Sequence, residues 1–378
     1  MNFNTIFLTS FRVLLLPIAL LYGLVIRIRN WMFDQQYLKS ASFNFPLICV
    51  GNLAVGGTGK SPMVEYLLYL LSPQFKVGTL SRGYKRKTKG YALANPATTA
   101  LEIGDEPMLF HMKFPQIPVA VGEERLVAIP QLLQDVPDLQ AIILDDAFQH
   151  RSVKAGFNIL LTEYSNIYVN DFFLPTGDLR DERRSAKRAN IIVVTKCPAD
   201  LSSERKQQII RNLKPRADQK VFFTRIAYGV PYHIFNYEDE WLLTPRVEVL
   251  LVCGIANPKP LKEYLHECTH TYYQQDYSDH HIFTIDDLNE IKEKFDRIHA
   301  KDKIILTTEK DAVRLLKFRD ELATLPMYVL PIRHDFLFGE GEQFNRMVTD
   351  FIRNFRYKPI SLVRKHRSKR NRSKNKNL

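Results

Sequence analysis

The sequence has few cysteines, and none of them is spaced for a metal site or a redox motif. Its 378 residues contain four, and no two form a Cys-X-X-Cys pair: Cys49, Cys197, Cys253 and Cys268. Three lie in or beside apolar runs typical of strands, so we expect buried, reduced thiols in a cytosolic compartment. Zinc ligands are also lacking, because Asp279-His280-His281 has no further ligands at suitable spacing.

Acidic residues are absent from the C-terminal end. The net charge is +12, but the last eighteen residues carry eight Lys and Arg residues and no acid, which leaves +4 for the rest. Residues 361–378 are therefore predicted to be a basic, low-complexity, disordered tail. No aromatic platform or recognition fold accompanies it, so we expect no nucleic-acid partner. Anionic lipid of the inner membrane is the favoured partner, and a tail that only improves solubility is the alternative.

The sequence also lacks an apolar run of full membrane-spanning length. Val13–Ile26 is almost unbroken and is flanked by arginines, but its fourteen residues would reach only about 21 Å as a helix. The hydrocarbon core is roughly 30 Å thick, and no small-residue cleavage site follows. We expect residues 1–28 to form a helix that lies in or dips into the cytoplasmic leaflet. A buried core helix is the alternative.

A glycine-rich turn is the most informative feature present. It follows the short apolar run Phe45–Val50 and precedes Met63–Leu71, whose apolar residues share one helical face. In a phosphate-binding loop, backbone N–H groups surround the phosphates, a lysine reaches the terminal phosphates and a hydroxyl binds magnesium. Ala54 stands where the strict motif has glycine, but the strand–loop–helix context favours nucleotide binding. The predicted nucleotide-binding residues are Val55, Gly56, Gly57, Thr58, Gly59, Lys60 and Ser61.

A second strand-like run ends in two carboxylates. Residues 141–144 are apolar and are followed by Asp145 and Asp146. An apolar strand that ends in aspartate is the arrangement that holds magnesium beside a phosphate-binding loop. Strand-like and helix-like runs alternate around it, which predicts a doubly wound parallel sheet.

Later segments predict a second unit and further charged sites. Adjacent carboxylates occur in Gly104-Asp105-Glu106-Pro107, and arginines cluster in residues 180–184. From about residue 227 the strand and helix pattern starts again, which predicts a smaller α/β unit connected through a ribbon at residues 228–243. Residues 342–355 have the pattern of a last amphipathic helix.

Six motifs, taken in order, resemble the tetraacyldisaccharide 4'-kinase family, the lipid A kinases of Gram-negative bacteria. The resemblance extends from the apolar N-terminal run to about Phe355. The motifs are Gly51-Asn52 through Lys60-Ser61-Pro62, Ser81-Arg82-Gly83-Tyr84, Gly104-Asp105-Glu106-Pro107, Asp145-Asp146-Ala147-Phe148-Gln149-His150, Asp279-His280-His281 and Thr308-Glu309-Lys310-Asp311.

The resemblance implies a reaction, a fold and a location. The reaction is phosphorylation by ATP and Mg²⁺ of the 4'-hydroxyl of lipid A disaccharide 1-phosphate, giving lipid IVA. The expected place is the cytoplasmic face of the bacterial inner membrane, where the protein would be peripheral or monotopic, and we expect a monomer. The implied fold is a P-loop NTPase-like α/β/α domain and a smaller α/β domain joined by a β-ribbon. The predicted limits are residues 1–28, 29–226, 227–335, 336–360 and 361–378.

The resemblance also implies roles for individual residues. Asp105 is the expected base, supported by a histidine of the Asp-His-His motif, and His280 is preferred over His281. An imidazolium beside the carboxylate would orient it and keep it ionised, which requires the second domain to close over the first. The remaining assignments are Lys60 and Asp146 as catalytic residues and Ser61, Asp145 and Glu106 as magnesium ligands.

The chain departs from the family pattern at three positions. Ser61 stands where threonine is usual and keeps the hydroxyl, and Ala147 replaces a common glycine. Asp178 replaces a common proline, which weakens the assignment of Arg180 to the phosphoryl site. A P-loop GTPase or metal-insertion ATPase would share the phosphate loop and the paired aspartates, but would not require the apolar N-terminal helix or the Asp-His-His motif. A non-enzymatic membrane-associated nucleotide sensor is a third class.

Overall fold

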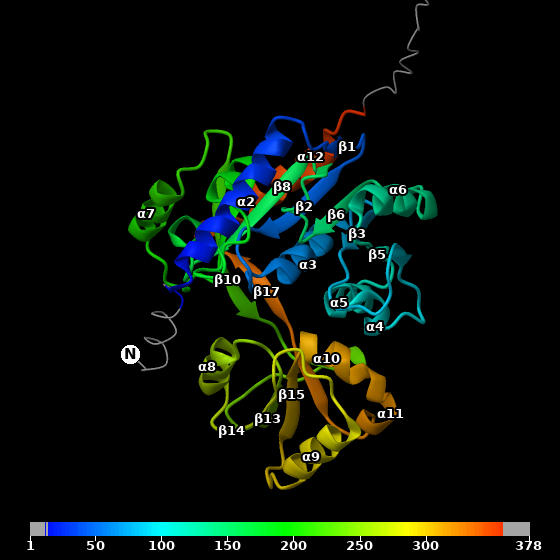
Figure 1. Ribbon diagram of the computed structural model, residues 1–378. Helices are drawn as coiled ribbons and strands as arrows, with labels where there is room; N and C mark the ends of the chain where they lie inside the picture. Colours follow the sequence, from blue (N-terminus) through cyan, green and yellow to red (C-terminus); the bar gives the residue numbers. More distant parts are fainter. Residues whose placement is uncertain (1–11, 13, 358–378) are drawn as a thin grey trace, which may run out of the picture.

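Two sheets divide the molecule into two layered halves (Figure 1). The computed structural model describes Arg12 and residues 14–357. Part of the predicted N-terminal helix (residues 1–11 and 13) and the predicted tail at 361–378 lie outside these residues.

The first sheet has nine strands in the order β17-β10-β9-β8-β2-β6-β3-β5-β4. Its central strands are runs of Val, Ile and Leu buried on both faces, as expected for parallel strands covered by helices on each side. Only β4 and β17 pair antiparallel to their neighbours. The strands span β2 Leu47–Asn52, β3 Val77–Ser81, β4 Ala92–Leu93, β5 Val119–Val121, β6 Ala141–Asp145, β8 Phe157–Glu163, β9 Ile191–Thr195, β10 Lys220–Tyr228 and β17 Ile332–Phe336.

Helices cover both faces of this sheet. Apolar residues of α6 and α7 pack into the core on one face, and those of α3, α5 and α12 into the core on the other. A short parallel pair, β1 (Ala41–Ser42) with β7 (Val153–Lys154), lies outside the sheet. The helices span α2 Leu16–Asp34, α3 Lys60–Leu71, α4 Ala100–Ile103, α5 Asp105–Lys113, α6 Arg125–Asp135, α7 Ser203–Leu213 and α12 Gly341–Arg353, with 3₁₀ turns at Tyr168–Asn170, Arg183–Arg188 and Leu337–Gly339.

The second sheet has six strands in the order β12-β11-β16-β15-β13-β14. Helices α9, α10 and α11 supply the core on one face, and α8 on the other. Threonine side chains cap α9 and α10 at Thr284 and Thr308, where each accepts a backbone N–H. The elements span β11 Tyr232–His233, β12 Asn236–Glu240, β13 Glu248–Cys253, α8 Lys259–Cys268, β14 Tyr272–Asp276, α9 Ile285–Asp296, β15 Lys303–Thr308, α10 Glu309–Leu315, a 3₁₀ turn Leu316–Phe318, α11 Arg319–Leu322 and β16 Met327–Leu330.

The chain passes between the two halves twice, and the two crossings lie side by side. It leaves the first sheet along β10 and returns along β17, and these two strands pair antiparallel from Thr224 with Phe336 to Tyr228 with Ile332 (Figure 1). Residues 228–243, predicted as the connecting ribbon, supply only the end of β10 to this connection and otherwise form β11 and β12. The second half is therefore an excursion between two neighbouring strands of the first.

A buried group of three charges lies at this junction. Lys113 of α5 contacts Glu65 of α3 and Glu309 of α10. The second oxygen of Glu309 accepts a hydrogen bond from the Ile332 backbone N–H, 3.2 Å away, at the start of β17. Burial, with Glu309 nearby, raises the pKa of Glu65 to about 8. Through Lys113, these contacts connect α3, the helix that follows the phosphate loop, to the second half.

Candidate functional site

The glycine-rich turn lies between β2 and α3 and is held from several sides. Its backbone has positive φ at Gly56 (+104°) and Gly59 (+84°), a conformation that glycine adopts without strain. The Thr58 hydroxyl accepts from Asn52 Nδ2 at 2.9 Å, and the Thr58 carbonyl accepts from the Thr195 hydroxyl at 2.9 Å. Because these partners come from the ends of two strands of the same sheet, β2 and β9, the sheet itself sets the shape of the loop.

A buried histidine holds the last turn of the loop. His334 of β17 lies 2.9 Å through Nε2 from the Gly59 carbonyl oxygen and 2.9 Å through Nδ1 from the Thr224 hydroxyl. A carbonyl can only accept, so Nε2 carries the proton and Nδ1 accepts from Thr224. Burial lowers the pKa of His334 to about 4, which keeps the ring neutral. The sequence contained no signal for this residue, because it lies 275 positions from Gly59.

Lys60, Asp146 and Arg180 form a charged centre beside the loop. Lys60 Nζ lies 3.8 Å from Asp146 Oδ1, and the Arg180 guanidinium contacts both oxygens of Asp146. Burial raises the pKa of Asp146, but Lys60 and Arg180 outweigh it and hold that pKa below its ordinary value. Arg180 Nη2 also donates to Asn52 Oδ1 at 2.5 Å. The structure thus places Arg180 among these groups although Asp178 replaces the family's proline nearby.

Asp145 is buried at the end of β6 and has one unsatisfied oxygen. The Ser81 hydroxyl donates to Oδ2 at 3.2 Å, whereas Oδ1 is buried with no hydrogen-bond partner among the described residues. Burial and neighbouring Asp146 raise the pKa of Asp145 to about 6. An orphaned carboxylate oxygen suits a hard cation such as Mg²⁺. The described residues contain no group of three or more His, Cys, Asp or Glu side chains that could hold a metal, which fits an ion held partly by phosphates.

The adjacent carboxylates Asp105 and Glu106 begin α5 and face the second half. Glu106 lies 3.5 Å from Lys310 Nζ of α10, and its charge also acts on Lys60 and Asp145. Asp105 Oδ2 lies 2.8 Å from Arg314 Nη2 of α10 and 3.4 Å from His280 Nδ1. The structure therefore brings Asp105 and His280 together, as expected. Arg314 is a third member of this group, and no sequence motif singled it out.

The two histidines of the Asp-His-His motif have different surroundings. His280 faces Asp105, and its φ of +62° lies in a region that residues with a side chain adopt rarely. His281 Nε2 instead lies 3.0 Å from Asp287 Oδ2, and its ring stacks on Tyr277. Since Asp287 closes the capping box of α9, His281 supports that helix. The geometry supports the preference for His280.

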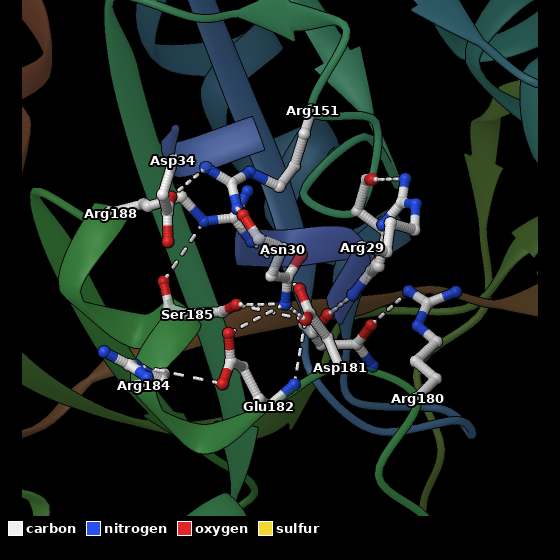
Figure 2. A network of polar contacts seen from close by, with 12 residues as sticks. Arg29, Asn30, Asp34, Arg151, Arg180, Asp181, Glu182, Arg184, Ser185 and Arg188 are labelled. Carbon is white, nitrogen blue, oxygen red and sulfur yellow. Dashed lines mark hydrogen bonds and ion pairs between the residues drawn. The ribbon is translucent and has the colours of Figure 1, made fainter. Parts of the chain in front are cut away.

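Helix α2 is attached to the first half by a polar network (Figure 2). Asn30 is buried and donates through Nδ2 to Asp181 Oδ1 at 2.7 Å and Glu182 Oε1 at 3.0 Å. Arg151 donates to the Asn30 carbonyl at 2.8 Å, and the Tyr22 hydroxyl donates to the Arg180 carbonyl at 3.1 Å. The helix thus joins the segment that carries Arg180.

The helix is longer than the apolar run that predicts it. It extends to Asp34, and it is the one described helix long and apolar enough by length and composition to cross a membrane. Its outer surface exposes large apolar side chains: Leu16, Ile18, Leu20, Leu21, Leu24, Val25, Ile28 and Trp31.

Comparisons with known proteins point to one family. A family model described as tetraacyldisaccharide-1-P 4'-kinase (LpxK) matches residues 11–353. Proteins named tetraacyldisaccharide 4'-kinase from Flavobacterium johnsoniae and Bacteroides thetaiotaomicron are 46% and 41% identical, over 90% of this chain and 97% and 93% of theirs. A crystal structure described as an "apo" form of LpxK from Aquifex aeolicus in complex with ATP is 26% identical. Its TM-score is 0.71, and the match covers 90% of this chain and 99% of that one.

Proposed function

The chain belongs to the tetraacyldisaccharide 4'-kinase family, and from this premise we propose how its residues transfer a phosphoryl group from ATP. It is a kinase of lipid A biosynthesis that phosphorylates the 4'-hydroxyl of tetraacyldisaccharide 1-phosphate to give lipid IVA. The expected family and α/β fold class are confirmed. The observation that carries the residue assignment is that the Lys60 and Asp146 centre lies beside the phosphate loop of the first half, while Asp105 of the first half meets His280 of the second.

The donor half of the site is built on the phosphate loop. Backbone N–H groups of residues 55–61 would surround the ATP phosphates, and Lys60 would reach their outer oxygens. Asp145, through its unsatisfied Oδ1, and Ser61 would hold Mg²⁺, with Glu106 near enough to contribute. When bound, Mg²⁺ neutralises phosphate charge in the transition state. Asp146 and Arg180 keep Lys60 directed at the loop through the contacts described above.

The acceptor half depends on Asp105. The 4'-hydroxyl oxygen forms a bond to the γ-phosphorus while the bond to the oxygen shared with the β-phosphorus breaks. ADP leaves with that electron pair, and the hydroxyl proton passes to Asp105. Because phosphoryl transfer depends mainly on positioning and charge neutralisation, the base needs a fixed orientation more than a high pKa.

A transfer assay tests this function. The protein is incubated with ATP labelled at the γ-phosphate, Mg²⁺ and tetraacyldisaccharide 1-phosphate in detergent, and the label in the lipid is measured. We expect label in the lipid that depends on both Mg²⁺ and the free 4'-hydroxyl. Hydrolysis of ATP or GTP without transfer to lipid would instead indicate an ATPase or GTPase and would refute the proposal.

We also propose that α2 lies on the cytoplasmic face of the inner membrane rather than crossing it. Tyr22, Arg29 and Asn30 bind the first half, so one face of the helix is held against the protein. Only its exposed apolar face is free to enter lipid, and anionic lipids would pair with its arginines. The chain would act as a monomer whose second domain is the segment between β10 and β17. Protease added to the outside of intact cells should not cleave the protein; cleavage within residues 35–357 would overturn this placement.

A further inference from the structure

The proposed base Asp105 is held from the second half of the molecule by an arginine. Arg314 of α10 donates to Asp105 Oδ2 through both Nε, at 2.9 Å, and Nη2, at 2.8 Å. One helical turn earlier, Lys310 pairs with Glu106. Residues four apart share a helix face, so α10 presents two cations to the first turn of α5. Arg314 is the better placed of the two, because its side chain is only 9% exposed.

The conformation of Arg314 is itself fixed by a buried carboxylate. Nη1 lies 3.2 Å from Asp311 Oδ1, and the side chain of Asp311 is fully buried. Asp311 Oδ2 accepts from the Gly254 backbone N–H at 3.0 Å and from the Thr308 hydroxyl at 2.8 Å. A continuous chain of hydrogen bonds therefore runs from the end of β13 and the cap of α10 to Asp105, through groups with little freedom to move.

Arg314 also determines the proton position on His280. Its Nη2 lies 3.0 Å from His280 Nδ1. A guanidinium nitrogen can only donate, so Nδ1 accepts and the ring proton is on Nε2. The guanidinium of Arg314 thus contacts both the Asp105 carboxylate and the His280 ring.

We propose that Arg314 is a positioning residue for phosphoryl transfer. It orients the Asp105 carboxylate, and it can do so only when the second domain lies against the first. This inference rests on the proposed role of Asp105 as the base. Both hydrogen bonds from Arg314 reach Oδ2, and no hydrogen bond or ion pair to Oδ1 is found within residues 14–357. Arg314 thus fixes the carboxylate and leaves one oxygen to accept the hydroxyl proton.

A double-mutant cycle separates positioning from a merely structural ion pair. The variants are Arg314→Gln, Asp105→Asn and both together, each assayed for kcat and for the KM of ATP. We expect R314Q to lower kcat about 100-fold, the usual effect of a misplaced catalytic group, with the KM of ATP unchanged. In the Asp105→Asn background the same substitution should change kcat by no more than about twofold, because the group that Arg314 orients is already gone.

The control is Glu309→Gln, which weakens another contact between the two halves without touching Asp105. Its effect on kcat should be the same in the wild-type and Asp105→Asn backgrounds. Arg314→Lys keeps the charge but cannot donate to Asp105 through two nitrogens, so its kcat should lie between those of wild type and R314Q. If thermal unfolding shows that R314Q does not fold, Arg314→Lys replaces it in the cycle.

Two results would overturn the inference in distinguishable ways. If R314Q lowers kcat by the same factor in both backgrounds, or raises only the KM of ATP, Arg314 does not act through Asp105. If Asp105→Asn alone turns over like wild type, the base assignment itself fails, and the positioning role falls with it.

Discussion

The donor and acceptor halves of the site are held together in different ways. The phosphate loop is fixed inside one sheet by hydrogen bonds from Asn52, Thr195 and His334. Asp105 is instead held across the junction between the two halves of the molecule by Arg314, and His280 lies beside this pair. The hydrogen bonds that shape the phosphate loop thus lie within the first half and do not depend on the position of the second. The acceptor half, in contrast, is complete only when α10 lies against α5. This difference predicts that ATP binding and catalysis can be altered separately.

The largest effect is expected at the donor half. Lys60→Met removes the cation nearest the outer phosphates and should lower kcat about 1000-fold. Lys262→Met, which removes an exposed lysine of the second domain bound to Gln274 and Asp276, is the charge-matched control and should retain wild-type turnover. Both are measured by label transfer from ATP to the lipid. Comparable activity of the two variants would contradict the assignment of Lys60.

A smaller effect, confined to turnover, is expected at the acceptor half. His280→Ala removes the ring beside Asp105 but leaves Arg314, so kcat should fall about 100-fold while the KM of ATP stays the same. His281→Ala removes a ring that supports α9. It should lower the thermal midpoint more than kcat. If His281→Ala mainly lowered kcat and His280→Ala mainly lowered the thermal midpoint, the roles assigned to the two histidines would be wrong.

The smallest effect is expected where the two halves meet behind the phosphate loop. His334→Leu leaves the Gly59 carbonyl without its donor, and the KM of ATP should rise about tenfold with a smaller change in kcat. His334→Gln can still donate to that carbonyl and should recover much of the loss. His233→Leu, at a histidine on β11 of the second sheet, is the control. An unchanged KM in folded His334→Leu would show that the loop holds its shape without this bond.

The same histidine makes a definite contribution to the pH dependence of stability. Its folded pKa of about 4 lies below the ordinary value of 6.5, so between these values the unfolded chain binds the proton and the folded chain does not. His334 therefore stabilises the fold less and less as the pH falls from 6.5 through 4. Denaturant unfolding of wild type and His334→Gln should show the wild type losing more stability over this range.

Much of the donor half could be predicted from the sequence because its parts are close together in the chain. The turn at residues 55–61, the strand before it and the helix after it follow the local patterns of a phosphate loop, and Asp145 and Asp146 end an apolar run that forms β6. The role of Glu106 and the other individual assignments stay predictions. The structure adds the positions of these side chains relative to one another.

The parts that the sequence did not reveal depend on contacts between distant segments. β17 reads as part of the second unit, yet it pairs with β10 and completes the first sheet. Arg314 follows Asp311 in an ordinary helix, and only the docking of α10 on α5 gives it a role. The Arg86 side chain is buried against Glu123, which lies 37 positions away in the chain. No periodicity or motif encodes such pairings, because they arise from how the two halves pack.

The antiparallel pairing of β10 with β17 has a consequence for how the chain could be divided. Tyr228 and Ile332 are paired neighbours, so the two ends of the excursion leave the first sheet side by side. A short turn could join them, and the chain without residues 230–331 would still contain all nine strands of that sheet and α12. Such a shortened protein would be a nucleotide-binding module without an acceptor site: we expect it to bind ATP and to transfer nothing. In modular terms, the second domain is an insert that is connected to the nucleotide-binding sheet through one antiparallel pair of strands.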